Sequence, residues 1–143
     1  MTTNLTPEEK RELFGDFDPD QYAGEAEQRW GSTEAYKQTQ RRTAKYTKAD
    51  WERIKGEAAQ NQAGFADAFD QGIPAGDARA MDLAEAHRQH ISRWFYDCPF
   101  EAHRGLGDMY VADPRFTANY DTEHPGLAQY VRDAIHANAD RQG

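Results

Sequence analysis

Apolar residues recur at the three- and four-residue spacing of an amphipathic helix in two segments of the second half of the chain. Between Asp77 and about Tyr96 these positions are Met81, Leu83, Ala84, His87, Ile91, Trp94 and Phe95. After Pro125 a second apolar stripe consists of Leu127, Tyr130, Val131, Ala134, Ile135 and Asn138. No stretch of the sequence has the alternation or the continuous apolar run of a β-strand. The pattern therefore predicts an all-α fold.

Helix start and stop signals follow one another closely along the chain. Thr6, Pro7 and Glu9 form an N-cap, a first-turn proline and a capping box. Similar signals predict helices over residues 7–14, 19–30, 33–45, 48–71, 77–96, 99–103 and 114–116, and from 125 onward. Gly105 and Gly107 are expected to keep the helix that begins at Pro99 short. Such frequent breaks favour an irregular array of short helices over a bundle of long ones.

Aliphatic residues are scarce, whereas aromatic residues are plentiful. Leu, Ile, Val and Phe make up 18 of the 143 residues, and Trp, Tyr and Phe together supply 17 rings. The only aliphatic residues in the segment 1–60, apart from alanine, are Leu5, Leu13 and Ile54, so the order of this segment must depend on aromatic contacts. We expect one domain over residues 1–143, with a marginally ordered region at 1–60 and a more stable helical core at 61–143.

The acidic balance and the single cysteine exclude several classes of protein. With 25 acidic against 17 basic residues, the chain alone is not expected to bind DNA or RNA, whose phosphates require clustered bases. Cys98 on its own excludes an intrachain disulfide and a multi-cysteine zinc site. The sequence has neither a bilayer-spanning apolar run nor a secretory signal, so we expect a cytoplasmic protein that makes no membrane contact.

Sequence motifs for catalysis and for metal binding are missing. The sequence has no Gly-x-Ser-x-Gly, no phosphate loop and no dinucleotide fingerprint, so we expect neither enzymatic activity nor a cofactor. His87 and His90 stand three residues apart, and acidic residues lie nearby in the sequence. Because no third strong ligand follows at a matching spacing, we expect no metal site.

Several short motifs, in a fixed order, resemble the TipAS antibiotic-recognition domain. They are the stretches 14–22 (FGDFDPDQY), 29–36, 87–88, 96–98 (YDC), 106–110 (LGDMY) and 113–116. The resemblance implies an all-α, globin-like fold without haem, found as the effector-binding half of MerR-type regulators and sometimes translated alone. Since the sequence shows neither a basic winged helix nor a heptad dimerisation helix, it looks like the stand-alone form.

The resemblance also implies a ligand class. Domains of this family bind large, apolar, heteroaromatic peptide antibiotics, above all thiostrepton-like thiopeptides, in a cleft that an N-terminal lid helps to close. We therefore expect this chain, as a monomer, to bind and sequester such an antibiotic and so to confer resistance. The alternative is a ligand-sensing effector domain of a MerR-type multidrug regulator. A third hypothesis is a small helical enzyme that modifies the drug through Glu101, His103 or Asp108.

Cys98 is the residue with the most distinctive chemistry. Thiopeptides carry dehydroalanines, to which a thiolate can add, so the resemblance implies covalent capture. The alternative is a small buried residue at a helix corner. Some relatives carry a second cysteine where this chain has Gly105, Pro99 stiffens the corner, and the charge of Asp97 disfavours the thiolate. We therefore expect mainly reversible binding.

The predicted ligand-binding residues combine aromatic side chains with the histidines near the cysteine. Trp94 falls seven residues after His87 on the same helix face and is the preferred ligand contact, with His87 in the cleft wall. Tyr110 and Phe116 line the opposite wall or belong to the core. The full set is Phe14, Phe17, Trp30, His87, Ile91, Trp94, Tyr96, Cys98, His103, Tyr110 and Phe116.

Overall fold

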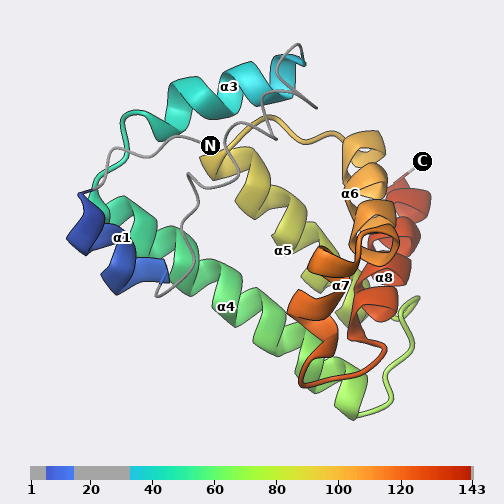
Figure 1. Cartoon of the computed structure of the whole chain (residues 1–143). Coiled ribbons are helices and arrows are strands. Elements are labelled where there is room, and N and C mark those ends of the chain that lie inside the picture. The colour runs from blue at the N-terminus through green and yellow to red at the C-terminus, as the bar shows by residue number, and fades with distance from the viewer. Residues whose placement is uncertain (1–5, 15–32, 143) are drawn as a thin grey trace. The chain divides into compact units, whose positions relative to one another are not determined.

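The described part of the chain is entirely helical. The computed structural model describes residues 6–14 and 33–142, with a few side chains of the first helix excepted. Its helices are α1 (Pro7–Phe14), α3 (Glu34–Thr43), α4 (Lys48–Asp70), α5 (Ala78–Trp94), α6 (Phe100–Ala112), α7 (Pro114–Asp121) and α8 (Leu127–Gln142) (Figure 1). These residues contain no strand, which confirms the all-α prediction. The helix predicted over residues 19–30 lies outside the described residues.

Side-chain caps fix several of the helix starts that the sequence predicts. At α1, Glu9 N–H donates to Thr6 Oγ1 (3.2 Å) and Thr6 N–H donates to Glu9 Oε1 (3.1 Å), which is the reciprocal capping box. Thr33 caps α3 by accepting a hydrogen bond from Tyr36 N–H (3.1 Å). Thr47 N–H donates to the Asp50 carboxylate (3.0 Å) at the start of α4. The predicted starts of these helices are therefore confirmed.

Two predicted helix boundaries are wrong. The helix expected to end at His103 continues as α6 to Ala112, through both glycines. Gly107 is buried against α8, where a Cβ would lie 3.4 Å from Arg132 Cα, so the glycine serves close helix packing rather than a turn. The helix expected over residues 114–116 extends to Asp121. In the first case tertiary packing outweighs the low helix propensity of glycine.

The structure divides into two compact units, each with its own core. The first unit consists of Met1–Ala58 and His90–Asp97, and the second of Ala59–Gln89 and Cys98–Gly143. The first core is built from aromatic rings and one isoleucine: Trp51, Ile54 and Trp94, with Tyr46 and Phe95 packed against them. The second core contains Phe65, Ala68, Ala80, Ala84, Leu127, Tyr130, Val131, Ala134 and Ile135, and thus includes most of the apolar stripe predicted for α8.

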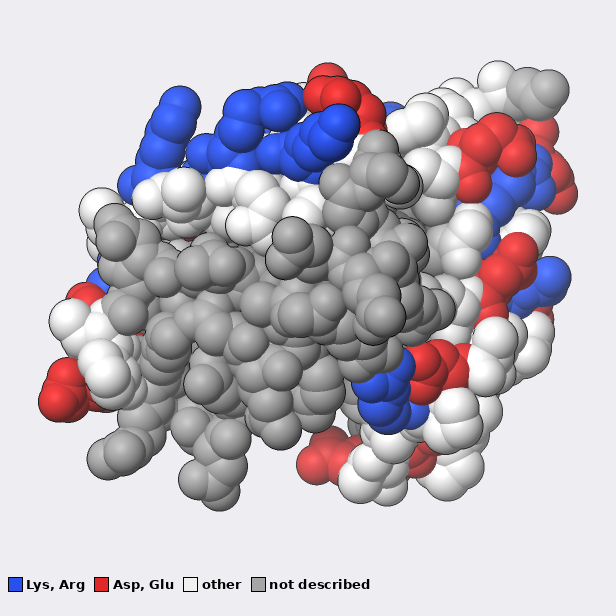
Figure 2. All heavy atoms as spheres, turned by 45° about the horizontal axis from the view of Figure 1, so that its top comes forward, with Lys and Arg blue, Asp and Glu red and all other residues white. Residues whose placement is uncertain are grey.

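Helix α3 has one face in contact with the end of α5 and one basic face. Arg42 donates to the Ser92 carbonyl (2.7 Å) and pairs with Asp97 (3.1 Å), both within the first unit. The exposed bases Lys37 and Arg41 lie on another face of α3 and Lys45 follows just after the helix, at four-residue intervals, and Figure 2 shows blue side chains in a row over this helix. This local excess of positive charge stands out in a chain whose formal net charge is −8.

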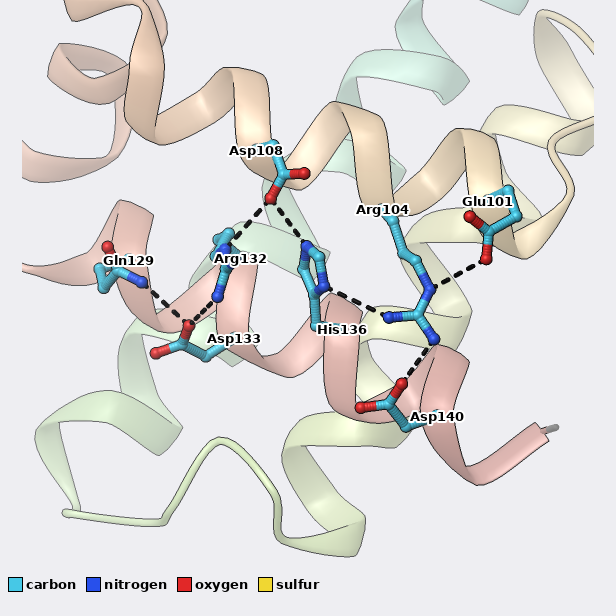
Figure 3. Close-up of polar contacts among 8 residues, drawn as sticks. All are labelled: Glu101, Arg104, Asp108, Gln129, Arg132, Asp133, His136 and Asp140. Atoms are coloured by element: carbon cyan, nitrogen blue, oxygen red, sulfur yellow. Dashed lines mark hydrogen bonds and ion pairs between the residues drawn. The ribbon is translucent and has the colours of Figure 1, made fainter.

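Helices α6 and α8 are joined by a row of polar contacts (Figure 3). Asp108 on α6 lies 2.8 Å from His136 Nε2 and 3.2 Å from Arg132 Nε on α8. Further along, Arg104 on α6 pairs with Asp140 on α8 (2.5 Å). Because the two carboxylates are exposed, each pair adds little stability, and the helices are also held together by the close packing at Gly107.

None of the helices in residues 6–14 and 33–142 is long and apolar enough to cross a membrane.

Candidate antibiotic-binding site

Two histidines from neighbouring helices lie at the centre of the candidate site in the second unit. His87 Nδ1 on α5 lies 2.8 Å from His103 Nε2 on α6, and the two rings stack with their centroids 5.1 Å apart. His103 is completely buried, whereas His87 is half-buried. His87 and His103 are 16 residues apart, on consecutive helices, so this pairing depends on the way the two helices pack.

Aromatic side chains extend the pair toward α7. The Tyr110 hydroxyl lies 3.4 Å from His87 Nε2, a long hydrogen bond. The Tyr110 ring contacts Phe116 and Tyr120 of α7, with centroid separations of 6.1 and 5.4 Å. His87, Tyr110, Phe116 and Tyr120 are all half-buried, so each combines core packing with partial exposure.

We call His87, His103, Tyr110, Phe116 and Tyr120 the imidazole–aromatic cluster. Four of its members belong to the set predicted from the sequence, and the structure brings these four together. Tyr120 was not predicted. Its signal was available, because it stands four residues after Phe116 on the same helix, the spacing at which two side chains share a face.

Burial keeps two polar groups of the cluster, His103 and Tyr120, neutral. Desolvation, reinforced by the neighbouring His87 and Arg88, lowers the pKa of His103 from 6.5 to about 3. Burial likewise raises the pKa of Tyr120 to about 12, although a hydrogen bond with Tyr110 acts to lower it. At neutral pH His103 and Tyr120 are therefore uncharged, and they stand among rings and hydrogen-bonding atoms. Such a surface suits an uncharged heteroaromatic ligand better than an ionic one.

Cys98 occupies the corner between α5 and α6, as the sequence predicts. The residue is only 2% exposed, and its Sγ lies 3.8 Å from the Pro99 carbonyl oxygen. Arg88 fixes the corner by donating to the Cys98 carbonyl (2.8 Å), while its guanidinium lies over the Phe100 ring (4.2 Å). A sulfur in this position is poorly placed to meet a large reagent.

The Glu85 carboxylate holds Arg88 in place. Glu85 accepts hydrogen bonds from Arg88 Nη2 (2.7 Å) and from the buried Asn138 of α8 (3.0 Å). These donors, Arg88 first, lower the pKa of Glu85 from 4.5 to about 2 even though partial burial opposes them. Sequence reasoning missed this support, although the three-residue spacing of Glu85 and Arg88 is typical of a helical ion pair.

The structure places another group of predicted residues in the first unit: Ile91, Trp94 and Tyr96. Trp94 is 8% exposed, packs edge-on against Tyr46 and donates from Nε1 to Glu57 (2.7 Å). Ile91 is also buried, whereas Tyr96 is half-buried. Whether these residues contact a ligand stays a prediction. The Phe14 side chain, Phe17 and Trp30 lie outside the described part of the chain.

Two other features of the structure do not form a competing site. A surface hollow of about 450 Å³ in the second unit is lined by Gly64, Arg79, Asp82 and Leu83, so it offers a single bulky apolar side chain and none of the predicted residues. Among the described residues, no three histidine, cysteine or acidic side chains are grouped as a metal site would need. His90, on which the metal hypothesis depended, lies 3.1 Å from the Ile54 carbonyl.

Comparison with known proteins identifies the class to which this fold and cluster belong. The family model described as the TipAS antibiotic-recognition domain matches residues 22–138. The chain therefore belongs to the TipAS antibiotic-recognition domain family, and the family and the globin-like all-α fold predicted from its motifs are confirmed.

Sequence identities to individual proteins show how similar the chain is to particular members of the family. The chain is 57% identical over 141 residues to the HTH-type transcriptional activator TipA of Streptomyces coelicolor, covering 99% of this chain and 56% of that protein. It is 34% identical to the HTH-type transcriptional activator mta of Bacillus subtilis, covering 93% of this chain and 53% of that one. The chain thus spans about half the length of these curated relatives.

Two solved structures are also similar. One is TipAS of Streptomyces lividans in complex with nosiheptide, from a thiopeptide antibiotic multidrug resistance system; it matches with a TM-score of 0.90 and 57% identity over 99% of both chains. The other is the antibiotic-binding domain of a TipA-class multidrug resistance transcriptional regulator, with a TM-score of 0.59 and 53% identity over 64% of this chain and 98% of that one.

Proposed function

We propose that this chain binds a thiopeptide antibiotic and that the imidazole–aromatic cluster of the second unit forms part of the binding surface. The observation that carries this proposal is the similarity over nearly the whole chain to TipAS in complex with nosiheptide. The cluster supports it, because aromatic rings and hydrogen-bonding atoms from three helices suit an apolar, heteroaromatic peptide.

Binding of this kind can serve two biological roles. As a separate protein, the domain would sequester the drug and lower its free concentration, which is the role we favour from the sequence. As part of a longer protein, it would be the ligand-sensing effector domain of a multidrug regulator. The second role is favoured by the relatives, which are named as transcriptional activators and are about twice as long as this chain.

We further propose that the bound drug is not chemically altered. The three residues considered for an enzyme have different partners in the structure. Glu101 pairs with Arg104 (3.2 Å), Asp108 with His136 (2.8 Å), and His103 with His87 (2.8 Å). A fully buried histidine with a depressed pKa and two exposed, ion-paired carboxylates do not make a general acid–base pair.

The test is titration of the chain with nosiheptide by calorimetry, followed by mass spectrometry of the recovered ligand. We expect saturable binding and an unchanged ligand mass. His87→Ala should weaken binding by about ten-fold, whereas His124→Ala, which removes a half-buried histidine outside the cluster, should not. Failure of the unmodified chain to bind nosiheptide would refute the proposed ligand class, and a changed ligand mass would refute a pure binding role.

A further inference from the structure

Basic residues are concentrated in one short segment of the first unit. Residues 35–49 contain five bases and no acidic residue, although acidic residues outnumber basic ones 25 to 17 in the whole chain. The five bases are Lys37, Arg41, Arg42, Lys45 and Lys48. A concentration of one charge against the opposite overall balance attracts partners of opposite charge to that part of the surface.

Two of the five bases serve the fold. Arg42 of α3 pairs with Asp97 (3.1 Å), in the segment that follows α5. Lys48, at the start of α4, pairs with Glu12 of α1. All four residues belong to the first unit. Because these two bases already have acidic partners, a bound molecule would have to meet the other three.

The other three bases form a row along one side of α3 (Figure 2), and we call Lys37, Arg41 and Lys45 the basic row. All three residues are exposed, and Lys37 and Lys45 have no acidic partner among residues 6–14 and 33–142. Arg41 contacts Glu34 (3.1 Å), but the two side chains are 62% and 78% exposed, so water screens this pair. The basic row therefore presents positive charge that the described acidic residues do not cancel.

The helix sets the spacing of the basic row. Lys37 and Arg41 lie four residues apart on α3. Lys45 follows four residues later, in a turn where its N–H donates to the Arg42 carbonyl (3.2 Å). Four residues advance about 6 Å along an α-helix and complete slightly more than one turn. The three bases therefore project from the same side at nearly equal intervals.

Contacts on another side of α3 hold the helix in place within the first unit. Arg42 donates to the Ser92 carbonyl (2.7 Å), and the Gln38 side chain accepts a hydrogen bond from Asp97 N–H (2.8 Å). Thr43 is completely buried. A partner would thus meet a helix that is already ordered, which lowers the entropic cost of association.

We propose that the basic row is a docking surface for an acidic helix of a partner protein. A helix with Glu or Asp at every fourth position presents carboxylates at the same interval of about 6 Å, so each carboxylate can meet one base. Complementary charges of this kind fix the orientation of a complex and speed its formation. The inference is separate from antibiotic binding, because no member of the basic row belongs to the predicted ligand-binding residues.

Two other anionic partners suit the basic row less well. Tight binding to nucleic acid depends on many phosphate contacts, whereas the row offers three bases in a chain whose formal net charge is −8. A helix that binds a membrane surface needs bulky apolar side chains next to its bases. At helical periodicity, the residues that flank the row are Gln38 and Gln40. An acidic helix requires neither further bases nor apolar neighbours.

The test is an NMR titration of the ¹⁵N-labelled chain, at low ionic strength, with a synthetic helical peptide that has Glu at every fourth position. We expect saturable amide shifts centred on residues 37–45 that disappear when salt is added. A second peptide of the same composition, with its glutamates distributed around the helix, should bind about ten-fold more weakly. Equal affinity for the two peptides, or no binding of the first, would overturn the proposal.

Lys37→Glu and Lys55→Glu are a matched pair of variants, because each reverses one exposed lysine of the first unit and changes the net charge equally. Lys37→Glu should weaken binding of the first peptide about ten-fold, whereas Lys55→Glu should leave it nearly unchanged. Equal weakening would show general electrostatic attraction and overturn docking at the row. Tighter binding of a DNA duplex or of phosphatidylserine vesicles than of the peptide would overturn the class of partner.

Discussion

The sequence and the structure indicate different roles for Trp94. Its position seven residues after His87 predicts a ligand contact, and the structure places it in the core of the first unit with a hydrogen bond to Glu57. Trp94→Ala should therefore lower the free energy of unfolding by about 3–5 kcal/mol, because it leaves a large cavity beside Tyr46. Trp94→Phe should cost less, since a ring remains. Urea denaturation measures both, and an unchanged midpoint for Trp94→Ala would refute this packing role.

Cys98 leads to a prediction about the mode of binding. Because its thiol is buried and held at a stiff corner, nosiheptide should bind reversibly, with any adduct forming only over hours and only at Cys98. Cys98→Ala should keep most of the affinity. Intact-protein mass spectrometry over time checks this. Rapid stoichiometric mass addition, lost together with binding in Cys98→Ala, would show the opposite.

At the residue scale, the sequence predicts which side chains carry chemistry but not which of them meet. His87, His103 and Tyr110 were all named from the sequence, yet their contact depends on the approach of α5 to α6. Tyr120 and Glu85 were missed although each has a neighbour on its own helix, Phe116 and Arg88; their contacts with Tyr110 and Asn138 on other helices could not be read from the sequence. Helical periodicity indicates on which face of a helix a residue lies, but not which residue of another helix it contacts.

At the element scale, helix α6 offers a matched pair of glycines. A Cβ at Gly107 would lie 3.4 Å from Arg132 Cα and from Ile135 Cδ1, whereas no described atom lies within 4 Å of one at Gly105. Gly107→Leu should destabilise the protein by about 1–3 kcal/mol through overpacking. Gly105→Leu should stabilise it by up to about 1 kcal/mol, because leucine favours the helix. Thermal unfolding compares the two, and equal effects would contradict the assigned packing of α6 on α8.

The same helix explains where prediction of elements succeeds and where it fails. Starts marked by Thr6, Thr33 and Thr47 were predicted, because a cap is a contact between residues two or three positions apart. The end of α6 was not, because the glycines at 105 and 107 look like a stop signal until α8 is placed against them. Local signals are sufficient for caps, whereas continuation through a glycine is decided by a distant partner.

For the whole molecule, buried titratable groups predict loss of stability in acid. The pKa of His103 is 6.5 when exposed and about 3 when folded, so the unfolded chain binds a proton that the folded one does not between these values. The free energy of unfolding should therefore fall as the pH drops from 6.5 toward 3, by at most about 1.4 kcal/mol per pH unit for this group. Glu85, with a pKa lowered to about 2, adds a similar loss below pH 4.5.

The variant His103→Gln separates these contributions. It removes the group that titrates between pH 6.5 and 3, so the free energy of unfolding should depend less on pH in that range, whatever its absolute value. Urea denaturation at a series of pH values gives the slope. A slope equal to that of the parent chain would show that His103 is not kept neutral by burial.

Ligand binding should also make some parts of the chain more ordered while it leaves others unchanged. Residues 1–60 have many aromatic side chains and almost no aliphatic ones, so a bound apolar ligand can supply contact surface that they lack. Amide hydrogen exchange in these residues should slow when nosiheptide is added, while α8, whose apolar face is already buried, should change little. Equal protection of residues 1–60 with and without the drug would contradict this expectation.

Two of the three boundaries between the two units fall inside helices, one within α4 after Ala58 and one within α5 after Gln89, and the third follows Asp97 in the segment between α5 and α6. Proteases nick exposed loops rather than helices, so a cut after Asp97, the one boundary outside a helix, cannot by itself separate the units. A cut in the loop at Gly72–Gly76 would instead divide both cores, since it parts Glu57 from Trp94. Shortened chains that begin near residue 60 should therefore expose Trp94 and aggregate. A fusion protein that contains this domain must therefore include the segment from Tyr46 to Ala58 as well as the residues that follow it.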